Sequence, residues 1–342
     1  MMKLFVPKRV FFEQKSLEYP LGKELWDRFE RMHVPAEIIG SHNKVTGIPA
    51  STPGQAYAEG KNTLVVGVRK TLKFKSCKPS AHYQLPLSTS CPSKCEYCYL
   101  QTTLGKKPYM RIYVNQDEIL KQASHYIEER KPEITSFEGA ATSDPLSLEP
   151  YSSALAKTID FFARQEFGRF RFVTKFTNVD SLLGLNHNSH THFRFSLNSN
   201  YVISTFEHGT PSLKERIEAA SKVARAGYPL GFIIAPILVF NGWEDEYRAL
   251  LENLRKQLTQ SCLQDLTFEL ITHRFTKRAK ENILQLFPET KLPMKEEERK
   301  VKFGQFGYIK YVYPNETYNK LKEFFSISIQ DIFPNARIDY FV

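Results

Sequence analysis

The chain has 342 residues, of which 42% are hydrophobic and 25% charged, a composition typical of a globular protein with a buried core. Lysine and arginine outnumber aspartate and glutamate by 47 to 37, which favours a polyanionic partner such as nucleic acid without requiring one. The longest apolar run, residues 229–240, is shorter than the ~20 residues that span a bilayer, and residues 1–20 lack the apolar stretch of a secretory signal. The composition therefore argues against a membrane or secreted protein, and we expect a cytoplasmic one.

Helices and strands are predicted along most of the chain. In the first 76 residues, apolar spacing predicts a helix at 23–32 and a strand at 62–70. From residue 82 the pattern predicts strands at 82–88, 133–139, 169–176, 192–198, 229–240 and 265–275, and helices at 115–131, 152–165, 212–227 and 244–258. Six strands separated mostly by helices predict parallel βα units, in either an incomplete (β/α) barrel or a doubly wound sheet. In both folds the functional residues lie at the carboxyl ends of the strands.

The last part of the chain has a different pattern. Residues 302–314 alternate aromatic and polar side chains around Gly304 and Gly307, which predicts a β-hairpin. We therefore divide the chain into a mixed N-terminal region (1–76), a central barrel (77–300) and a C-terminal hairpin with a tail (301–342).

Three of the five cysteines, Cys91, Cys95 and Cys98, lie within eight residues at the spacing C-x3-C-x2-C. In a reducing compartment such a group is more typical of metal binding or catalysis than of disulfides. A structural zinc site needs four protein ligands, and the fourth would be His82, Cys77 or a remote residue. A four-iron cluster held by only three thiolates keeps one iron open to a small chelating molecule. Both possibilities stay open from the spacing alone.

The cysteine loop, with Tyr97 before its last cysteine and a predicted strand ahead of it, resembles the signature of the radical S-adenosylmethionine (SAM) enzymes. That resemblance implies a 4Fe-4S cluster, with S-adenosyl-L-methionine bound to its open iron. Over nearly the whole chain the sequence also resembles the spore photoproduct lyases, in the stretches STSCPSKCEYCYLQTTLG, EGAATSDPLSLEP, RFVTKFTNVD, HFRFSLN, THRFTKRAK and FGYIKYVYP. The implied fold class is α/β: a partial (β/α)6 TIM-type barrel of the radical SAM type, with an N-terminal extension and a C-terminal β-hairpin.

The resemblance implies an enzyme, a radical SAM carbon–carbon lyase that repairs DNA. Its substrate would be spore photoproduct, two adjacent thymines joined by a methylene bridge after ultraviolet damage. A 5′-deoxyadenosyl radical would remove hydrogen from C6 of the reduced thymine, the bridge would break, and a protein cysteine would return hydrogen to the resulting methylene radical. The implied partners are double-stranded DNA that carries the lesion and a one-electron donor such as flavodoxin or ferredoxin. We expect a monomer that acts in the spore core of a spore-forming bacterium, when the spore germinates.

The resemblance also implies roles for individual residues. The cluster ligands would be Cys91, Cys95 and Cys98. Tyr99 would lie at the cofactor, and Tyr97 would accompany it in a radical relay. The remaining contacts to S-adenosyl-L-methionine would come from residues at the ends of successive strands, namely Ser143, Lys175, Ser196, Asn198 and the backbone of Ala235.

The chain departs from the family where the hydrogen-donating cysteine is expected. Alignment on the TSD motif places that cysteine at Ala141, and alanine has no S–H to donate. We therefore expect a donor-defective chain that still cleaves its cofactor but does not return two intact thymines cleanly. The alternatives are an engineered variant and a natural homologue with another donor. Cys77 and Cys262 are distant in sequence, but folding could bring either one close.

Basic stretches with interleaved aromatic residues, at 69–78, 106–111 and 273–280, are candidates for contacts to DNA phosphates, although each could also be an ordinary solvated face. A lesion inside a duplex must leave the base stack to reach a barrel interior, and an aromatic hairpin could fill the space that it leaves. The expected lesion contacts are Arg274, Phe306, Tyr308 and Lys310. Two other functions stay open from the residues alone: another radical SAM enzyme that acts on nucleic acid, such as a tRNA-modifying one, and a zinc-containing nucleic-acid-binding module without catalysis.

Overall fold

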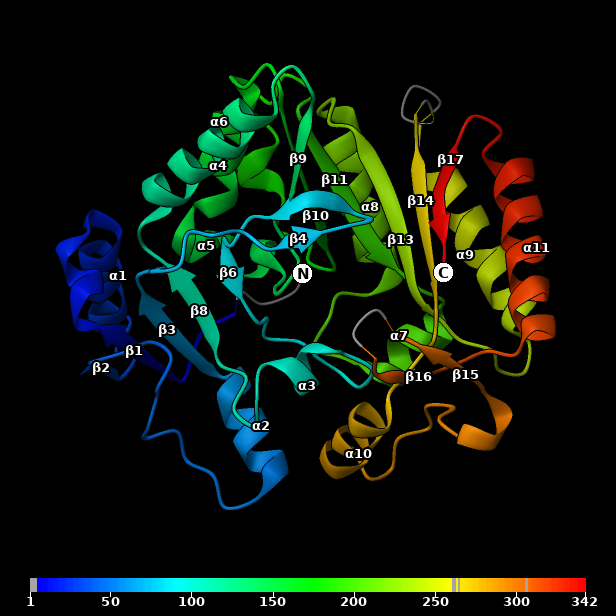
Figure 1. Cartoon of the computed structure of the whole chain (residues 1–342), viewed down its shortest axis with the longest axis horizontal. Helices are drawn as coiled ribbons and strands as arrows, with labels where there is room; N and C mark the ends of the chain where they lie inside the picture. The colour runs from blue at the N-terminus through cyan, green and yellow to red at the C-terminus, as the bar shows by residue number, and fades with distance from the viewer. Residues whose placement is uncertain (1–4, 260–262, 264, 305–306) are drawn as a thin grey trace. The chain divides into compact units, whose positions relative to one another are not determined.

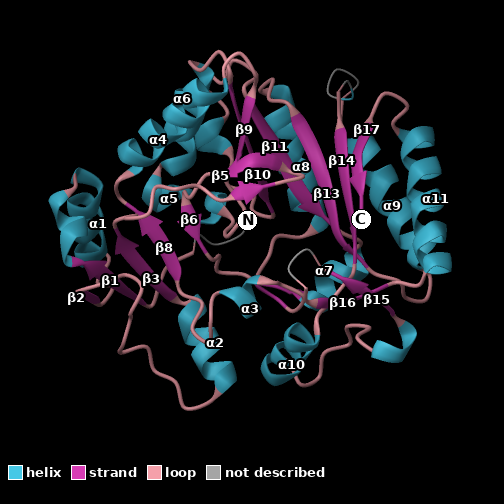
Figure 2. Cartoon of the chain, viewed as in Figure 1, coloured by secondary structure: helices cyan, strands magenta, loops and turns pink. Residues whose placement is uncertain are grey.

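The computed structural model describes residues 5–259, 263, 265–304 and 307–342. Helices and strands alternate along it (Figure 2), and the chain divides into two compact units. The first unit comprises Met1–Pro92 and Leu104–Phe193, and the second comprises Ser93–Thr103 and Arg194–Val342. Within the described part, no helix is long and apolar enough to cross a membrane. The three-part division made from the sequence stays a prediction.

The first unit contains a five-stranded sheet in the order β2-β1-β3-β8-β6. The strands are β1 (Arg9–Glu13), β2 (Ala36–Ile39), β3 (Thr63–Gly67), β6 (Ser88–Thr89) and β8 (Met110–Tyr113). The first four strands in that order are parallel, and only β6 runs antiparallel to its neighbour. The helices α1 (Pro20–Arg31) and α2 (Pro53–Lys61) belong to this region, and α1 buries Leu25 and Phe29 against the apolar side chains of β1 and β3. The helix and strand expected here are confirmed, but the sequence did not predict this sheet.

A second group of strands in the first unit carries part of the candidate site. It consists of β4 (Ser76–Cys77), β5 (Ala81–Gln84), β9 (Thr135–Glu138) and β10 (Gly168–Thr174). The strands β5, β9 and β10 are parallel, and β4 folds back onto β5 as an antiparallel hairpin. The helices α4 (Gln116–Arg130) and α6 (Ala154–Ala163) lie side by side (Figure 1), and the short α5 (Glu149–Ser152) precedes α6. Phe162 of α6 packs on Phe137 and Phe170, so aromatic burial holds the helix against the strands.

The second unit continues the βα alternation. β11 (Thr191–Leu197) begins in the first unit and ends in the second, where β13 (Leu230–Ile237), β14 (Thr267–Thr272) and β17 (Arg337–Phe341) follow, the last three parallel to one another. The long helices are α8 (Leu213–Arg225), α9 (Trp243–Gln257) and α11 (Asn315–Ile332). Ser212 and Glu215 form a capping box at the start of α8, where the sequence placed the helix start. Trp243 and Tyr247 of α9 pack edge-on against two phenylalanines of α11, beside which it lies in Figure 1.

Shorter elements complete the second unit. They are β7 (Lys94–Cys95), α3 (Leu100–Thr103), α7 (Asn200–Phe206), β12 (Glu207–His208), α10 (Lys277–Leu286), β15 (Lys300–Phe303) and β16 (Ile309–Val312). The antiparallel pair β15–β16 confirms the predicted hairpin, with Gly304 and Gly307 at its turn. Gly307 has a φ of +75°, which favours glycine, and the ring of Tyr308 lies where a side chain on Gly304 would be. The sequence had left the rest of the tail unassigned, and α11 and β17 lie there.

Candidate active site

The backbone of the cysteine loop is held by hydrogen bonds from neighbouring side chains and backbone groups. The Cys95 carbonyl accepts a hydrogen bond from the Gln101 side-chain amide at 2.7 Å and from the Cys98 N–H at 3.2 Å. In the first unit, the buried ammonium of Lys61 donates to the Cys91 carbonyl at 2.8 Å. Cys95 itself lies in β7, opposite Glu207 of β12. The carbonyls of Cys91 and Cys95 thus have hydrogen-bond partners within the protein, which helps to hold the loop in one conformation.

The three cysteines suit an iron–sulfur cluster by their chemistry, since thiolates are its usual ligands and only three are needed when a small molecule binds the open iron. Among the residues that the structure describes, no three histidine, cysteine or carboxylate side chains gather into a metal site. Cys91 belongs to the first unit, whereas Cys95 and Cys98 belong to the second. Their shared role as cluster ligands therefore stays a prediction.

The two tyrosines of the loop differ sharply. Tyr99 exposes 60% of its surface, whereas the hydroxyl of Tyr97 donates a short hydrogen bond to the carboxylate of Glu207. Burial raises the pKa of Tyr97 well above its usual value, and the Glu207 carboxylate raises this pKa further. The two tyrosines that flank Cys98 were expected to act as companions, but they have different environments.

The carboxylate that holds Tyr97 is itself held by Arg216 of α8. Arg216 Nη2 lies 2.5 Å from Glu207 Oε2, and neither side chain has exposed surface. The remaining guanidinium contacts go to the Ser196 carbonyl at 3.0 Å, the Pro211 carbonyl at 3.0 Å and the Thr210 hydroxyl at 2.8 Å. Glu207 and Arg216 were not predicted from the sequence, because no motif distinguishes them from surface charges nine residues apart.

In the first unit, a buried aspartate connects two of the predicted cofactor residues. Asp144 follows Ser143 and accepts hydrogen bonds from the Thr174 hydroxyl at 2.7 Å and the Lys175 N–H at 2.8 Å. Ser143 in turn accepts a hydrogen bond from the Ser88 hydroxyl at 2.8 Å. Burial raises the pKa of Asp144 to about 6, against the lowering effect of these donors. The ends of β9 and β10 thus come together as predicted, through Asp144, which was not among the predicted site residues although it belongs to the TSD motif.

In the second unit, Asn198 joins the ends of β11 and β13. Its side chain has no exposed surface, its amide donates to the Pro236 carbonyl at 2.9 Å, and its oxygen accepts from the Ser199 N–H at 3.0 Å. The adjacent Ala235 is half-buried at an irregularity in the pairing of β13 with β14. The predicted ribose contact would therefore use the second amide hydrogen of Asn198 or the second lone pair of its oxygen.

Two of the predicted lesion contacts line a cavity of about 650 Å³ in the second unit. Arg274 and Lys310 lie there together with Lys300, Lys302 and Phe303 of the hairpin. Tyr308 is 43% exposed, and the ammonium of Lys310 lies 4.9 Å from the centre of its ring. Phe306 lies outside the described residues. The lining carries four cationic side chains, which suits a phosphate-bearing ligand.

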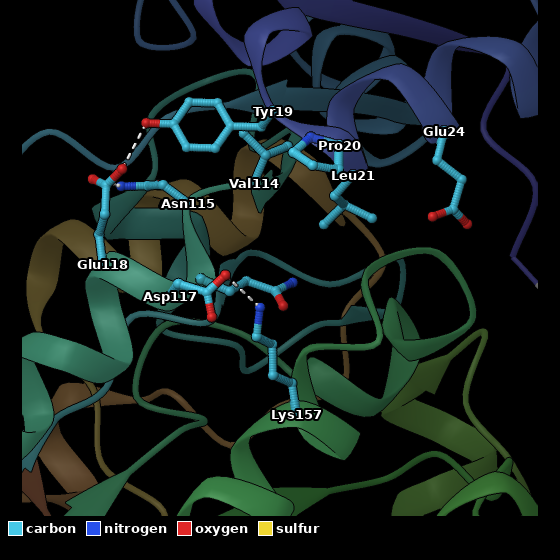
Figure 3. Close-up of a pocket in the computed structure, with 10 residues that line it drawn as sticks. Tyr19, Pro20, Leu21, Glu24, Val114, Asn115, Asp117, Glu118 and Lys157 are labelled. Carbon is cyan, nitrogen blue, oxygen red and sulfur yellow. Dashed lines mark hydrogen bonds and ion pairs between the residues drawn. The ribbon is translucent and has the colours of Figure 1, made fainter.

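A second cavity, of about 250 Å³, lies in the first unit near the starts of α1 and α4 (Figure 3). In it the Tyr19 hydroxyl donates to Glu118 at 2.7 Å, and Lys157 forms an ion pair with Asp117 at 2.7 Å. None of the predicted site residues lines this cavity. Its polar groups bond one another, so it offers little to a ligand.

Comparison with known proteins agrees with the resemblance. The family model for spore photoproduct lyase matches residues 5–342. The curated spore photoproduct lyases of Bacillus subtilis and Clostridium acetobutylicum are 51% and 50% identical over 341 and 336 residues, and the alignments cover 100% and 98% of both chains. A solved spore photoproduct lyase complexed with dinucleoside spore photoproduct is 52% identical with a TM-score of 0.97, over 99% of this chain and 100% of that one.

Another solved structure is a doubly substituted spore photoproduct lyase, with one cysteine changed to alanine and one serine changed to cysteine. It has bound AdoMet and dinucleoside spore photoproduct, is 53% identical to this chain, and matches with a TM-score of 0.97 over 99% of this chain and 100% of that one. These likenesses confirm the α/β partial-barrel fold and favour the lyase over the tRNA-modifying and zinc-module alternatives. The chain therefore belongs to the spore photoproduct lyase family.

Proposed function

We propose that this chain is a DNA repair lyase that reverses spore photoproduct to two thymines. The observation that carries the proposal is the likeness at 50–53% identity, over essentially the full length, to proteins of that name. One of them was solved with AdoMet and dinucleoside spore photoproduct bound. The cationic hairpin cavity, lined by Arg274 and Lys310, supports DNA as the partner.

The cofactors are a 4Fe-4S cluster and S-adenosyl-L-methionine, which together supply the 5′-deoxyadenosyl radical that starts the reaction. Cys91, Cys95 and Cys98 would hold the cluster. The residues that would bind S-adenosyl-L-methionine are Tyr99, Ser143, Lys175, Ser196, Asn198 and Ala235. Asp144 would position two of them, since it bonds the Lys175 N–H and directly follows Ser143.

Because Ala141 has no S–H, repair needs a hydrogen-donating thiol elsewhere in the chain, and we propose Cys77. The turn that follows Cys77 closes with a hydrogen bond from the Ser80 N–H to the Cys77 carbonyl at 2.9 Å. The Ser80 hydroxyl then donates to one oxygen of Glu138 at 3.1 Å, and the other oxygen accepts from the Ala140 N–H at 3.1 Å. One carboxylate therefore joins the turn that carries Cys77 to the residue just before Ala141. Cys262, the other candidate, lies outside the described residues.

The solved relatives point to the same cysteine. Their substituted tyrosine and cysteine carry position numbers one lower than Tyr99 and Ala141. With this offset, the serine that is changed to cysteine in the doubly substituted relative falls on Cys77. That relative thus carries alanine and cysteine at the two positions where this chain has Ala141 and Cys77. The two positions act as alternatives for one thiol, and the chain is a repair enzyme with a relocated donor rather than a defective one.

The proposed step transfers one hydrogen atom. The methylene radical on the substrate takes the hydrogen of the Cys77 S–H, so that the thymine methyl group forms and a thiyl radical stays on sulfur. The thiyl radical recovers a hydrogen atom through the tyrosines, which draw it from the 5′-deoxyadenosine that the first abstraction formed. The thiol and the cofactor are both restored, and no external oxidant is needed.

The remaining proposals follow from the chemistry. The cluster needs one electron, which a flavodoxin or a ferredoxin would deliver. We propose that the chain works as a monomer in the compartment that holds the chromosome, the cytoplasm that becomes the spore core, because its substrate forms in spore DNA.

The test is an anaerobic assay of the reconstituted, reduced protein with S-adenosyl-L-methionine and dinucleoside spore photoproduct. We expect two thymines from the parent chain, loss of clean repair in Cys77→Ala, and recovery when Ala141→Cys is added to Cys77→Ala. Ser76→Ala, next to Cys77, is the matched control and should repair normally. Cleavage of S-adenosyl-L-methionine without any response to the lesion would contradict the lyase function, whereas full repair by Cys77→Ala would contradict only the donor.

A further inference from the structure

The hydroxyl of Tyr97 is held by a buried ion pair, an arrangement that Tyr340 shares through Glu269 and Arg194. The Tyr97 hydroxyl donates to Glu207, whose second carboxylate oxygen lies 2.5 Å from Arg216. By contrast, Tyr151 donates to a backbone carbonyl at 2.6 Å, and Tyr247 accepts from a backbone N–H at 2.9 Å. A backbone group is thus sufficient to satisfy a buried hydroxyl in this fold.

The ion pair is costly unless every polar group has a partner, because both charges must lose their water. Arg216 meets that condition through bonds to Pro211, Ser196 and Thr210 as well as to Glu207. Two of these partners are backbone carbonyls, whose positions are fixed by the fold. The carboxylate is therefore held in place before it meets the tyrosine.

The strand that carries Glu207 is also tied to the cysteine loop. β12 pairs with β7 so that Glu207 lies opposite Cys95, and the Glu96 N–H donates to the Phe206 carbonyl at 2.9 Å. Tyr97 and Glu207 thus sit on segments joined by backbone hydrogen bonds. Arg216 adds a link to the carbonyl of Ser196, whose side chain is a proposed cofactor contact. One guanidinium orients both the tyrosine and the end of β11.

We propose that Glu207, held by Arg216, is a positioning residue for Tyr97: it keeps the hydroxyl in one orientation and its hydrogen engaged, so that the hydrogen passes along the relay and not to the carbon radical of the substrate. This inference rests on the proposed function, since it assigns a task within that reaction. A hydrogen atom bonded to a carboxylate must first leave that bond before it can reach a carbon radical. The loss of a charge-assisted bond of this kind corresponds to a change in rate of about ten- to a hundredfold.

The experiment compares the parent with Tyr97→Phe, Glu207→Gln and the double variant, each as the reconstituted holoenzyme. The measured quantity is the 5′-deoxyadenosine released per pair of thymines formed, which rises when the relay fails to restore the cofactor. We expect both single variants to raise this ratio by about tenfold and the double variant to match Tyr97→Phe, because residues that act through one contact are not additive. Glu218→Gln, an exposed carboxylate on the same helix as Arg216, is the control and should match the parent.

A second readout does not depend on turnover. The midpoints of thermal unfolding of the same four proteins form a cycle, and we expect the double variant to unfold no lower than the less stable single variant. If Glu207→Gln alone fails to retain iron and sulfide, Glu207→Gln combined with Arg216→Met removes both buried charges and is measured in its place.

A parental ratio in the Glu207 variants while Tyr97→Phe raises it would overturn the inference, and so would additive effects in the double variant. A parent chain that cleaves S-adenosyl-L-methionine but repairs nothing would instead overturn the proposed function. In that case the thermal cycle still decides whether Glu207 and Tyr97 are coupled.

Discussion

Two buried carboxylates of the first unit and two of the second are stabilised by different kinds of partner. In the first unit, Asp144 and Glu149 accept hydrogen bonds mainly from backbone N–H groups, and burial raises their pKa values to about 6 and about 7. In the second unit, Glu207 and Glu269 each contact a buried arginine, at 2.5 and 2.7 Å. The stability contributed by the two carboxyls of the first unit should therefore depend on protonation near neutral pH. The stability contributed by the two carboxylates of the second unit should depend on keeping the charged partner.

The cause lies in which donors each segment offers. Glu149 precedes α6, whose first N–H groups have no partners within the helix, and it accepts from Leu155 and Ala156 at 2.7 and 2.9 Å. In the second unit, arginines on β11 and α8 lie close enough to Glu269 and Glu207 to form ion pairs. Dipoles compensate a buried charge less completely than an opposite charge does, which is why the two carboxyls of the first unit have raised pKa values.

The largest effect is expected from breaking the ion pair of Arg194 with Glu269. Both side chains are at most 2% exposed, and Tyr340 also donates to Glu269 at 2.7 Å. Arg194→Met leaves a buried carboxylate without its cation and should lower the free energy of unfolding by about 3–5 kcal/mol, measured by urea denaturation. Arg194→Met combined with Glu269→Leu removes both charges and should recover most of the loss. An equal loss in the double variant would show that packing, and not charge, controls this site.

The next effect concerns pH. Because the pKa of Glu149 rises from 4.5 to about 7 on folding, the folded state holds a proton more tightly than the unfolded state does. This stabilisation is fully present below pH 4.5 and is lost as the pH rises through about 7; over that range it amounts to roughly 3 kcal/mol. Glu149→Gln should flatten that part of the curve of unfolding free energy against pH. If the slope of unfolding free energy against pH were unchanged in the variant, Glu149 would not be the group that causes it.

A smaller effect is expected at the cap of α8, the helix that carries Arg216. The Ser212 side chain accepts from the Glu215 N–H at 3.3 Å, and the Glu215 carboxylate accepts from the Ser212 N–H at 2.8 Å in return. Ser212→Ala should cost about 1 kcal/mol of unfolding free energy. Ser212→Asn keeps a capping oxygen and should cost much less, so equal losses from the two variants would contradict the capping role.

The smallest effect is expected for an ion pair on the outer face of the same helix. Lys214 and Glu218 lie 3.9 Å apart with 80% and 51% of their side chains exposed. Glu218→Gln should change the unfolding free energy by less than about 0.5 kcal/mol, because solvent screens exposed pairs. A loss of unfolding free energy comparable to that of Arg194→Met would show that burial does not determine the strength of ion pairs in this unit.

Periodic patterns were sufficient to predict most of the elements that position the site. The six strands of the βα alternation occur as expected, and the ends of β9 and β10 meet as parallel strand ends should. Elements without a strong pattern were missed, such as the five-stranded N-terminal sheet and β17, whose side chains are mostly only partly buried.

Single residues that act through tertiary contacts were harder to foresee. Asp144, Glu207 and Arg216 resemble ordinary charged residues in the sequence, and only folding places them in the interior. Cys77 is distant from Ala141 along the chain, and nothing in the sequence distinguished it from Cys262 as a donor. The contact of Ser80 and Ala140 with one carboxylate brings the two segments together, and no local pattern encodes it.

The most direct test of the account is repair of dinucleoside spore photoproduct in D2O, where a thiol carries deuterium but a carbon-bound hydrogen does not exchange. The parent chain should yield thymine with one deuterium in its methyl group, and Cys77→Ala should lose both this label and clean repair. Labelled thymine formed by Cys77→Ala at the parental rate, or unlabelled thymine from the parent, would show that Cys77 is not the donor.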